Sequence, residues 1–148
     1  LSMAESKVIG KVKKVNDHAF IIRGEERLPG YVGDPVFEHD ALETNASGSL
    51  GVILTDNTRV SLGPKSRLVL NEFVFNPKEE KYSFASEIMR GTLVYLSGMM
   101  AKLSPESVSI KTPTATVGIR GTKLIIRILE EGEEYEGDED TEQIPEGP

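Results

Sequence analysis

The chain has 148 residues, of which 38% are hydrophobic and 28% charged, and it carries a formal net charge of −7. This length predicts one domain that can bury a core without disulfide or metal staples. The apolar runs are far shorter than the roughly 20 residues of a membrane-spanning helix, which excludes such a span within this sequence. The absence of cysteine excludes thiol nucleophiles, disulfides, thiolate zinc sites and iron–sulfur clusters.

The negative charge is concentrated at the C-terminus. Residues 130–148 contain ten acidic residues and no basic one, so all 17 basic residues lie in residues 1–129 beside the other 14 acids. Residues 1–129 therefore carry a charge of about +3. The composition of residues 130–148, which are acidic and poor in apolar side chains, is typical of a disordered segment. We predict a flexible N-terminus or expression remnant over 1–6, a β domain over 7–129 and a disordered acidic tail over 130–148. Weak binding of calcium or of a basic partner is the functional alternative for this tail.

Short segments with β-branched and aromatic residues, separated by turn residues, follow one another along the chain. In chain order, the pattern predicts strands over 8–15, 19–23, 49–55, 58–62, 66–75, 81–85, 91–96, 107–111 and 124–129. Only 84–90 and 97–103 have helix-like composition, and each is too short to be stable alone. The sequence therefore predicts an all-β single domain of many short, mostly antiparallel strands, arranged as a roll, a sandwich or a solenoid-like stack.

The most distinctive segment is 112–124, TPTATVGIRGTKL. Proline at 113 favours an extended residue before it, and the following apolar residues alternate with threonine and glycine. Arg120 stands between two glycines. The sequence leaves open whether Arg120 lies on the solvent face or binds an anionic group of a partner.

This segment resembles the closing motif of the FecR domain, and other pieces of that domain occur in the expected order. They are an opening strand at 10–12, a G-D and D-x-L-x-T section at 33–44, a strand–turn–strand at 48–62 and a glycine strand at 91–93. The resemblance covers about residues 7–128, with a longer segment at 97–106 than the family usually has. The matching motif residues, expected to be structural or partner-binding, are Thr112, Pro113, Thr114, Ala115, Gly118, Arg120, Gly121 and Thr122.

The resemblance implies an all-β domain that is exported to the periplasm, with any leader peptide already removed. Name-giving members of the family relay the state of an outer-membrane receptor to a sigma factor. This sequence has no membrane helix, no anti-sigma segment and no small receptor-contacting domain, so that role is not carried over. We expect a free-standing FecR-like domain without a cofactor.

Several groups of polar residues have a structural and a functional interpretation. His18 and His39 each have a carboxylate neighbour, and surface positions are favoured over a metal or acid–base site. For the acidic residues Asp34, Asp40 and Glu43, we expect a role in capping turns rather than in binding calcium. Lysines occur at 7, 11, 13 and 14. We interpret this basic cluster as part of a solvated or edge-protecting strand rather than as a nucleic-acid-binding site.

Met99 and Met100, with Leu96 and Leu103, form a short apolar stripe that predicts core packing, with a partner-binding surface as the alternative. The sequence shows no catalytic constellation. We therefore expect a non-enzymatic, periplasmic or secreted protein-interaction or sensing module whose partner is another envelope protein. The alternatives are a structural or adhesin-associated envelope scaffold that uses strand addition at an open edge, and, less favoured, a hydrolytic or carbohydrate-active enzyme with dispersed acids.

Overall fold

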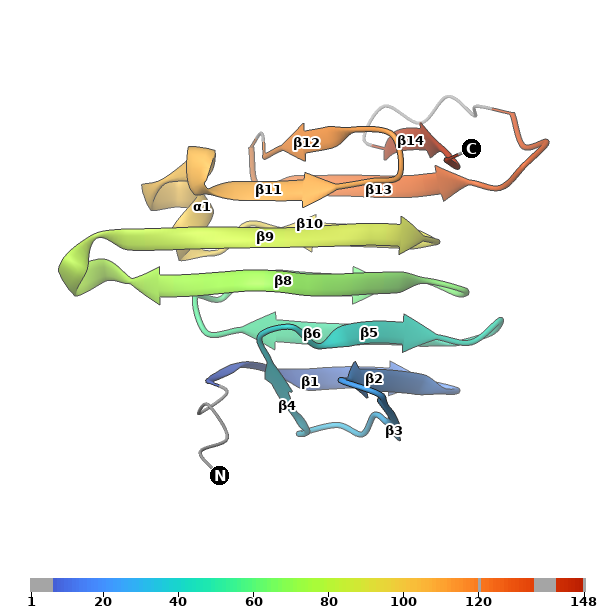
Figure 1. The fold of residues 1–148 in the computed structure, drawn as a ribbon, viewed down its shortest axis with the longest axis horizontal. Helices are drawn as coiled ribbons and strands as arrows, with labels where there is room; N and C mark the ends of the chain where they lie inside the picture. The colour runs from blue at the N-terminus through green and yellow to red at the C-terminus, as the bar shows by residue number, and fades with distance from the viewer. Residues whose placement is uncertain (1–6, 120, 135–140, 148) are drawn as a thin grey trace.

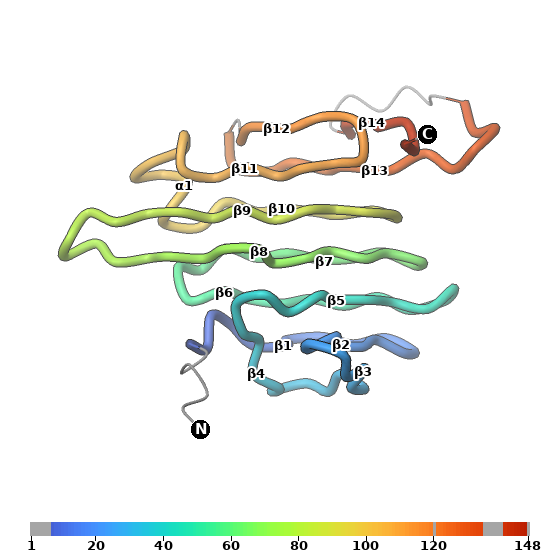
Figure 2. The backbone as a smooth tube through the Cα atoms, in the orientation of Figure 1, coloured from blue at the N-terminus to red at the C-terminus, as the bar shows by residue number. Residues whose placement is uncertain are grey.

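A computed structural model describes residues 7–119, 121–134 and 141–147. Within these residues the chain forms two seven-stranded sheets that lie face to face, with the strands of one layer over those of the other (Figure 1; Figure 2). The architecture is an all-β sandwich, which confirms the predicted fold class and selects one of the three arrangements left open by the sequence.

The first sheet has the order β14-β13-β10-β7-β6-β1-β4. Its strands, in chain order, are β1 (Val8–Asn16), β4 (Pro35–Phe37), β6 (Ser49–Leu54), β7 (Arg59–Leu62), β10 (Thr92–Leu96), β13 (Lys123–Leu129) and β14 (Thr141–Pro145). All neighbours in this sheet are antiparallel except β13 and β14, which are parallel.

The second sheet has the order β12-β11-β9-β8-β5-β2-β3. Its strands are β2 (Ala19–Arg23), β3 (Glu26–Pro29), β5 (Ala41–Thr44), β8 (Arg67–Asn76), β9 (Lys81–Arg90), β11 (Val108–Lys111) and β12 (Thr116–Gly118). Here β9 and β11 are the parallel pair. Short helical turns occur at η1 (Pro77–Glu79), α1 (Met99–Leu103) and η2 (Pro105–Ser107).

The core lies between the sheets because inward and outward residues alternate along the strands. In β6, for example, Leu50, Val52 and Leu54 are buried and the residues between them are half-exposed. A register shift between Leu70 and Glu72 interrupts the alternation in β8, so inward positions change from even to odd residue numbers. Phe73 can then point inward and meets Phe84 edge-on, with ring centroids 5.2 Å apart.

The helix expected over 84–90 is wrong, because this segment belongs to β9. Phe84, Ser86 and Ile88 are buried at every second position, and pairing with β8 and β11 overrides the weak helical propensity of the intervening residues. The helical prediction at 97–103 is confirmed by α1, although the helix begins at Met99.

The C-terminal segment differs from the expected continuous disorder over 130–148. Thr141–Pro145 forms β14, which pairs with β13, and Ile144 packs against the core. The composition of residues 130–148 as a whole is acidic and polar. Within it, however, the short segment TEQIP contains threonine and isoleucine, which favour a strand.

Candidate functional site

The first part of the FecR-like motif forms the turn between β11 and β12. The buried hydroxyl of Thr112 accepts hydrogen bonds from the backbone N–H of Thr114 and Ala115, at 3.3 and 2.9 Å. The N–H of Thr112 in turn donates to the carbonyl of Ala115 at 2.8 Å. Thr112 therefore fixes the turn in the manner of an ST-turn, and Pro113 is exposed beside it.

The second part of the motif holds the link between β10 and α1. The N–H and hydroxyl of Ser97 donate to the carbonyls of Thr122 and Gly121, at 2.8 and 3.1 Å. Gly121 has a φ of +71°, a conformation that favours glycine. Gly118 lies in β12 opposite Ser109. Arg120, the candidate anion-binding residue, lies outside the described residues.

The two methionines proposed as a partner surface face opposite environments. Met100 is fully buried in the core, whereas Met99 is 49% exposed. Leu103 is 54% exposed and lies four residues after Met99, on the same face of α1. The exposed apolar pair is therefore Met99 and Leu103, with Met100 anchoring the helix.

Asp56, which lies between the predicted strands 49–55 and 58–62, positions α1. Its side chain is 2% exposed and accepts hydrogen bonds from the N–H of Thr58, the hydroxyl of Thr58 and the N–H of Met100, at 3.0, 2.9 and 3.0 Å. The carbonyl of Asp56 accepts the N–H of Met99 at 2.7 Å. The start of the helix is thus capped from the β6–β7 turn.

Tyr95 lies beneath the same region and is 1% exposed. Burial raises the pKa of Tyr95 to about 12, because the phenolate form would lose its hydration in the core. Its ring lies 6.4 Å from the ring of Phe84 in the opposite sheet. Tyr95 is consequently a core residue that carries a proton at neutral pH.

The acidic residues weighed as calcium ligands are engaged in turns and ion pairs. Asp34 and Asp40 accept the N–H of Tyr31 and Phe37, each at 2.8 Å. Asp40 also binds Arg23 through two hydrogen bonds of 2.9 and 2.8 Å, which raise the pKa of that guanidinium. The preference for turn capping is confirmed for these two residues.

Glu43 lies on the outer side of β5 among three arginines. Its carboxylate binds Arg67 and lies 3.5 Å from both Arg27 and Arg90. In the described part of the chain, no group of three or more His, Asp or Glu side chains is placed to hold a metal ion.

Both histidines are at the surface, as expected. The side chains of His18 and His39 are 70% and 77% exposed and lie 3.5 and 3.6 Å from their neighbours Asp17 and Glu38. A hydrogen bond from Ser47 holds the pKa of Asp17 below its usual value. Asp17 binds Ser47 directly, without an intervening histidine, so this group lacks the order of a nucleophilic triad.

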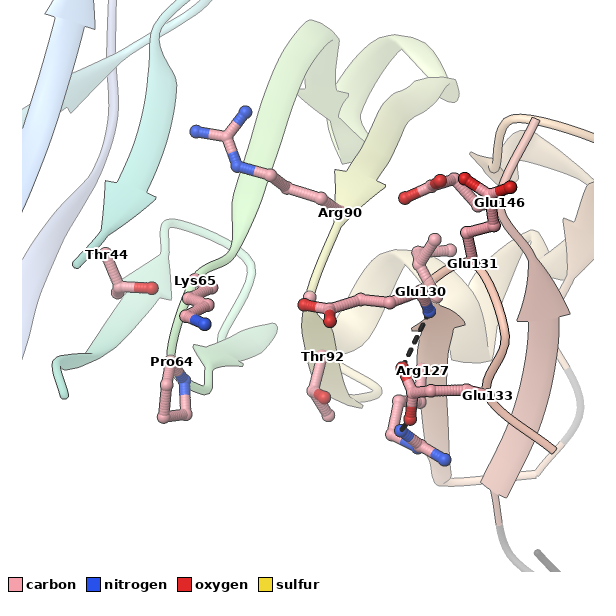
Figure 3. A pocket seen from close by; sticks show the side chains of 12 residues that line it. Thr44, Pro64, Lys65, Arg90, Thr92, Arg127, Glu130, Glu131, Glu133 and Glu146 are labelled. Carbon is pink, nitrogen blue, oxygen red and sulfur yellow. Dashed lines mark hydrogen bonds and ion pairs between the residues drawn. The ribbon is translucent and has the colours of Figure 1, made fainter. Parts of the chain in front are cut away.

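A pocket of about 630 Å³ opens at the end of the sandwich where β9 turns into β10 (Figure 3). Lys65 and Arg90 lie on one side, and Glu130, Glu131 and Glu146 lie on the other. The complete lining is Thr44, Pro64, Lys65, Arg90, Gly91, Thr92, Arg127, Ile128, Glu130, Glu131, Glu133 and Glu146.

One carboxylate of this pocket is fixed in its ionised form. Glu133 binds Arg127 and also accepts the N–H of Glu130 at 2.6 Å. The bond from Arg127 holds the pKa of Glu133 below its usual value. An ionised carboxylate bound to arginine is poorly suited to donate a proton at neutral pH, so Glu133 serves to shape this wall rather than to act as a general acid.

Comparison with family models decides the assignment, since the model described as FecR protein matches residues 40–136. The chain belongs to the FecR family. The match includes the turn residues from Asp40, the α1 region and the whole 112–124 motif, but it leaves the resemblance noted for 10–36 outside its limits. FecR domains are envelope-associated and of a regulatory or sensing type.

Comparisons with curated proteins and with solved structures gave no match. Among the described residues of this FecR domain, no helix has the length and hydropathy needed to cross a membrane.

Proposed function

We propose that this FecR domain is a non-enzymatic protein-interaction or sensing module that acts in the periplasm or after secretion. The observation that carries the proposal is the exposed pair Met99 and Leu103 on α1. Apolar side chains that lie side by side at the surface can form a protein-binding site, and methionine adapts to varied partners. Asp56 and the buried Met100 supply the rigid support here.

The family assignment supports the regulatory part of the proposal. The motif side chain of Thr112 is used for a turn, and the motif backbone at Thr122 holds the segment that leads into α1. The motif backbone at Gly121 and Thr122 thus helps to hold the exposed pair in place. The partner is expected to be another envelope protein.

The test is site-specific cross-linking in the native envelope, with a photoreactive residue at Met99. We expect one discrete cross-linked protein, lost when Leu103→Asp is added. Val74→Asp is the matched control, because Val74 is also an exposed apolar residue, at 36%, and lies on β8. A cross-linking pattern that is unchanged by Leu103→Asp would contradict the proposed surface. Fractionation of the tagged native gene product tests the compartment separately.

A scaffold role is the second candidate, and the edge strand β12 favours it. Within the described residues β12 pairs only with β11, and Thr116 and Gly118 are exposed. An open edge of this kind can accept a strand of another protein. Thr116→Lys places a charge on that edge, so it should abolish assembly by strand addition and leave cross-linking through Met99 intact.

A further inference from the structure

The central strands of the first sheet carry positive charges and no negative one. The five neighbouring strands β13, β10, β7, β6 and β1 contain no Asp or Glu. Their basic residues are Lys11, Lys13, Lys14, Arg59, Lys123 and Arg127. The strands of the second sheet, in contrast, contain both signs of charge, and the arginines there pair with Asp40 or Glu43.

The strand register aligns three of these cations in one row. Lys11 lies opposite Ile53, Ile53 opposite Arg59, Arg59 opposite Leu96 and Leu96 opposite Lys123. Directly opposed residues share a face of the sheet, so cations and apolar side chains alternate across β1, β6, β7, β10 and β13, which are successive in Figure 2. We call these five residues the cationic row.

The row is available to a partner. Lys11, Arg59 and Lys123 are exposed, Leu96 is 38% exposed and Ile53 is half-buried. Within the part of the chain that the structure describes, none of these three cations is in an ion pair. Three exposed cations of one sign give this face a positive potential, which attracts an anionic partner.

The spacing of the row indicates what kind of anion fits. Neighbouring strands are about 4.8 Å apart, so the cations on alternate strands are about 10 Å apart. A polyproline-II segment has three residues per turn and rises about 3.1 Å per residue, which places every third side chain on one face at intervals of about 9 Å. Acidic residues at every third position would therefore meet the three cations in succession.

We propose that the cationic row binds an extended acidic segment of a partner protein, with carboxylates at every third residue. The inference rests on the proposed function only in taking the partner to be a protein. Ile53 and Leu96 give apolar contacts between the charges, and the row has no aromatic side chain on which nucleic-acid bases could stack. Leu96 is followed by Ser97 and Gly98, which lead into α1.

The sequence offers a probe with the required spacing. Residues 130–143 contain nine acidic residues, and those at 130, 133, 136, 139 and 142 follow one another at intervals of three. A labelled synthetic peptide with the sequence of residues 130–143 should bind the full chain, measured by fluorescence anisotropy at low salt, and bind less tightly as salt is raised.

Two charge-reversal pairs give the matched comparison. Arg59→Glu with Lys123→Glu should weaken peptide binding by about tenfold or more, since two attractive contacts become repulsive. Lys78→Glu with Lys81→Glu changes the net charge equally at exposed positions around η1 and should change the affinity by less than about twofold. Circular dichroism checks that both variants are folded.

The proposal is overturned if the peptide does not bind, or if both pairs weaken binding equally. It is also overturned if phosphatidylglycerol vesicles or a single-stranded oligonucleotide bind more tightly than the peptide and depend on Arg59 and Lys123. Leu103→Asp should leave peptide binding nearly unchanged. A negative peptide experiment would therefore overturn the proposal for the cationic row but not the proposed α1 surface. A negative cross-linking experiment would overturn the α1 surface but not the cationic row.

Discussion

The backbone N–H of Met100 donates a 3.0 Å hydrogen bond to the carboxylate of Asp56, a buried residue 44 positions earlier in the chain. This bond joins the β6–β7 turn to the start of α1. Because α1 has only five residues, its own hydrogen bonds cannot hold it in place. The position of the exposed Met99 therefore depends on Asp56.

Asp56→Ala should lower the free energy of unfolding by about 2–4 kcal/mol, because it leaves the N–H of Thr58 and of Met100 without a partner in the core. Urea denaturation followed by circular dichroism measures the change. Thr55→Ala is the control, since Thr55 is exposed in the same turn, and it should cost less than about 0.5 kcal/mol. Equal stability of the two variants would show that the cap contributes nothing.

Gly98→Ala should destabilise the same junction by steric overlap. A Cβ atom at Gly98 would lie 2.3 Å from the backbone nitrogen of Thr58 and 2.5 Å from the carbonyl oxygen of Asp56. Backbone atoms cannot move away as a flexible side chain can, so we expect a loss of about 2 kcal/mol or more. Thermal unfolding measures this loss.

The control for this prediction is Gly118→Ala. A Cβ at Gly118 would meet no atom within 4 Å, so the variant should be as stable as the parent or slightly more stable. If Gly98→Ala and Gly118→Ala have the same melting temperature, the close approach between α1 and the β6–β7 turn is not present in solution.

Local pattern was sufficient to predict most strands, because alternation and turn residues are local signals. Val60 and Leu62, two residues apart in the predicted strand 58–62, are both buried in β7. At 84–90 the same approach failed, since the choice between helix and strand was decided by pairing with β8 and β11. Such pairing partners lie far away in the sequence.

The candidate surfaces are harder to predict from the sequence than the strands, because they too depend on contacts between residues that are distant in the sequence. Met99 and Met100 are adjacent in sequence, yet only Met100 is buried, and the sequence does not reveal which side of α1 faces the core. The cationic row consists of single residues from five strands, and it exists only through their register. From the sequence alone, the lysines at 11, 13 and 14 therefore have no visible connection with Arg59 and Lys123.

Tyr95 should make the stability of the domain sensitive to alkaline pH. Burial raises its pKa to about 12, whereas an unfolded tyrosine titrates near 10. The folded chain thus keeps a proton that the unfolded chain releases, so the stabilisation is complete below about pH 10 and is lost as the pH rises toward 12. The loss should be about 1–3 kcal/mol over this interval.

Denaturant midpoints measured between pH 9 and 12 check the role of Tyr95. Tyr95→Phe removes the titrating group and should show a shallower fall in stability than the parent chain. Tyr31→Phe is the control because Tyr31 is 65% exposed, and it should follow the parent. Parallel curves for Tyr95→Phe and the parent would contradict the burial of an ionisable hydroxyl at this position.

In the strand β14, Ile144 is the residue that packs against the core. Ile144 lies opposite Ile128 and packs against the core, whereas Glu142 is exposed in the same strand. Ile144→Asp should detach β14, since burial of a carboxylate would cost more than the short parallel pairing contributes. Amides of β13 that face β14 should then exchange with deuterium about tenfold faster or more. Glu142→Gln should leave their exchange unchanged, and slow exchange in both variants would show that β14 is held by its backbone bonds alone.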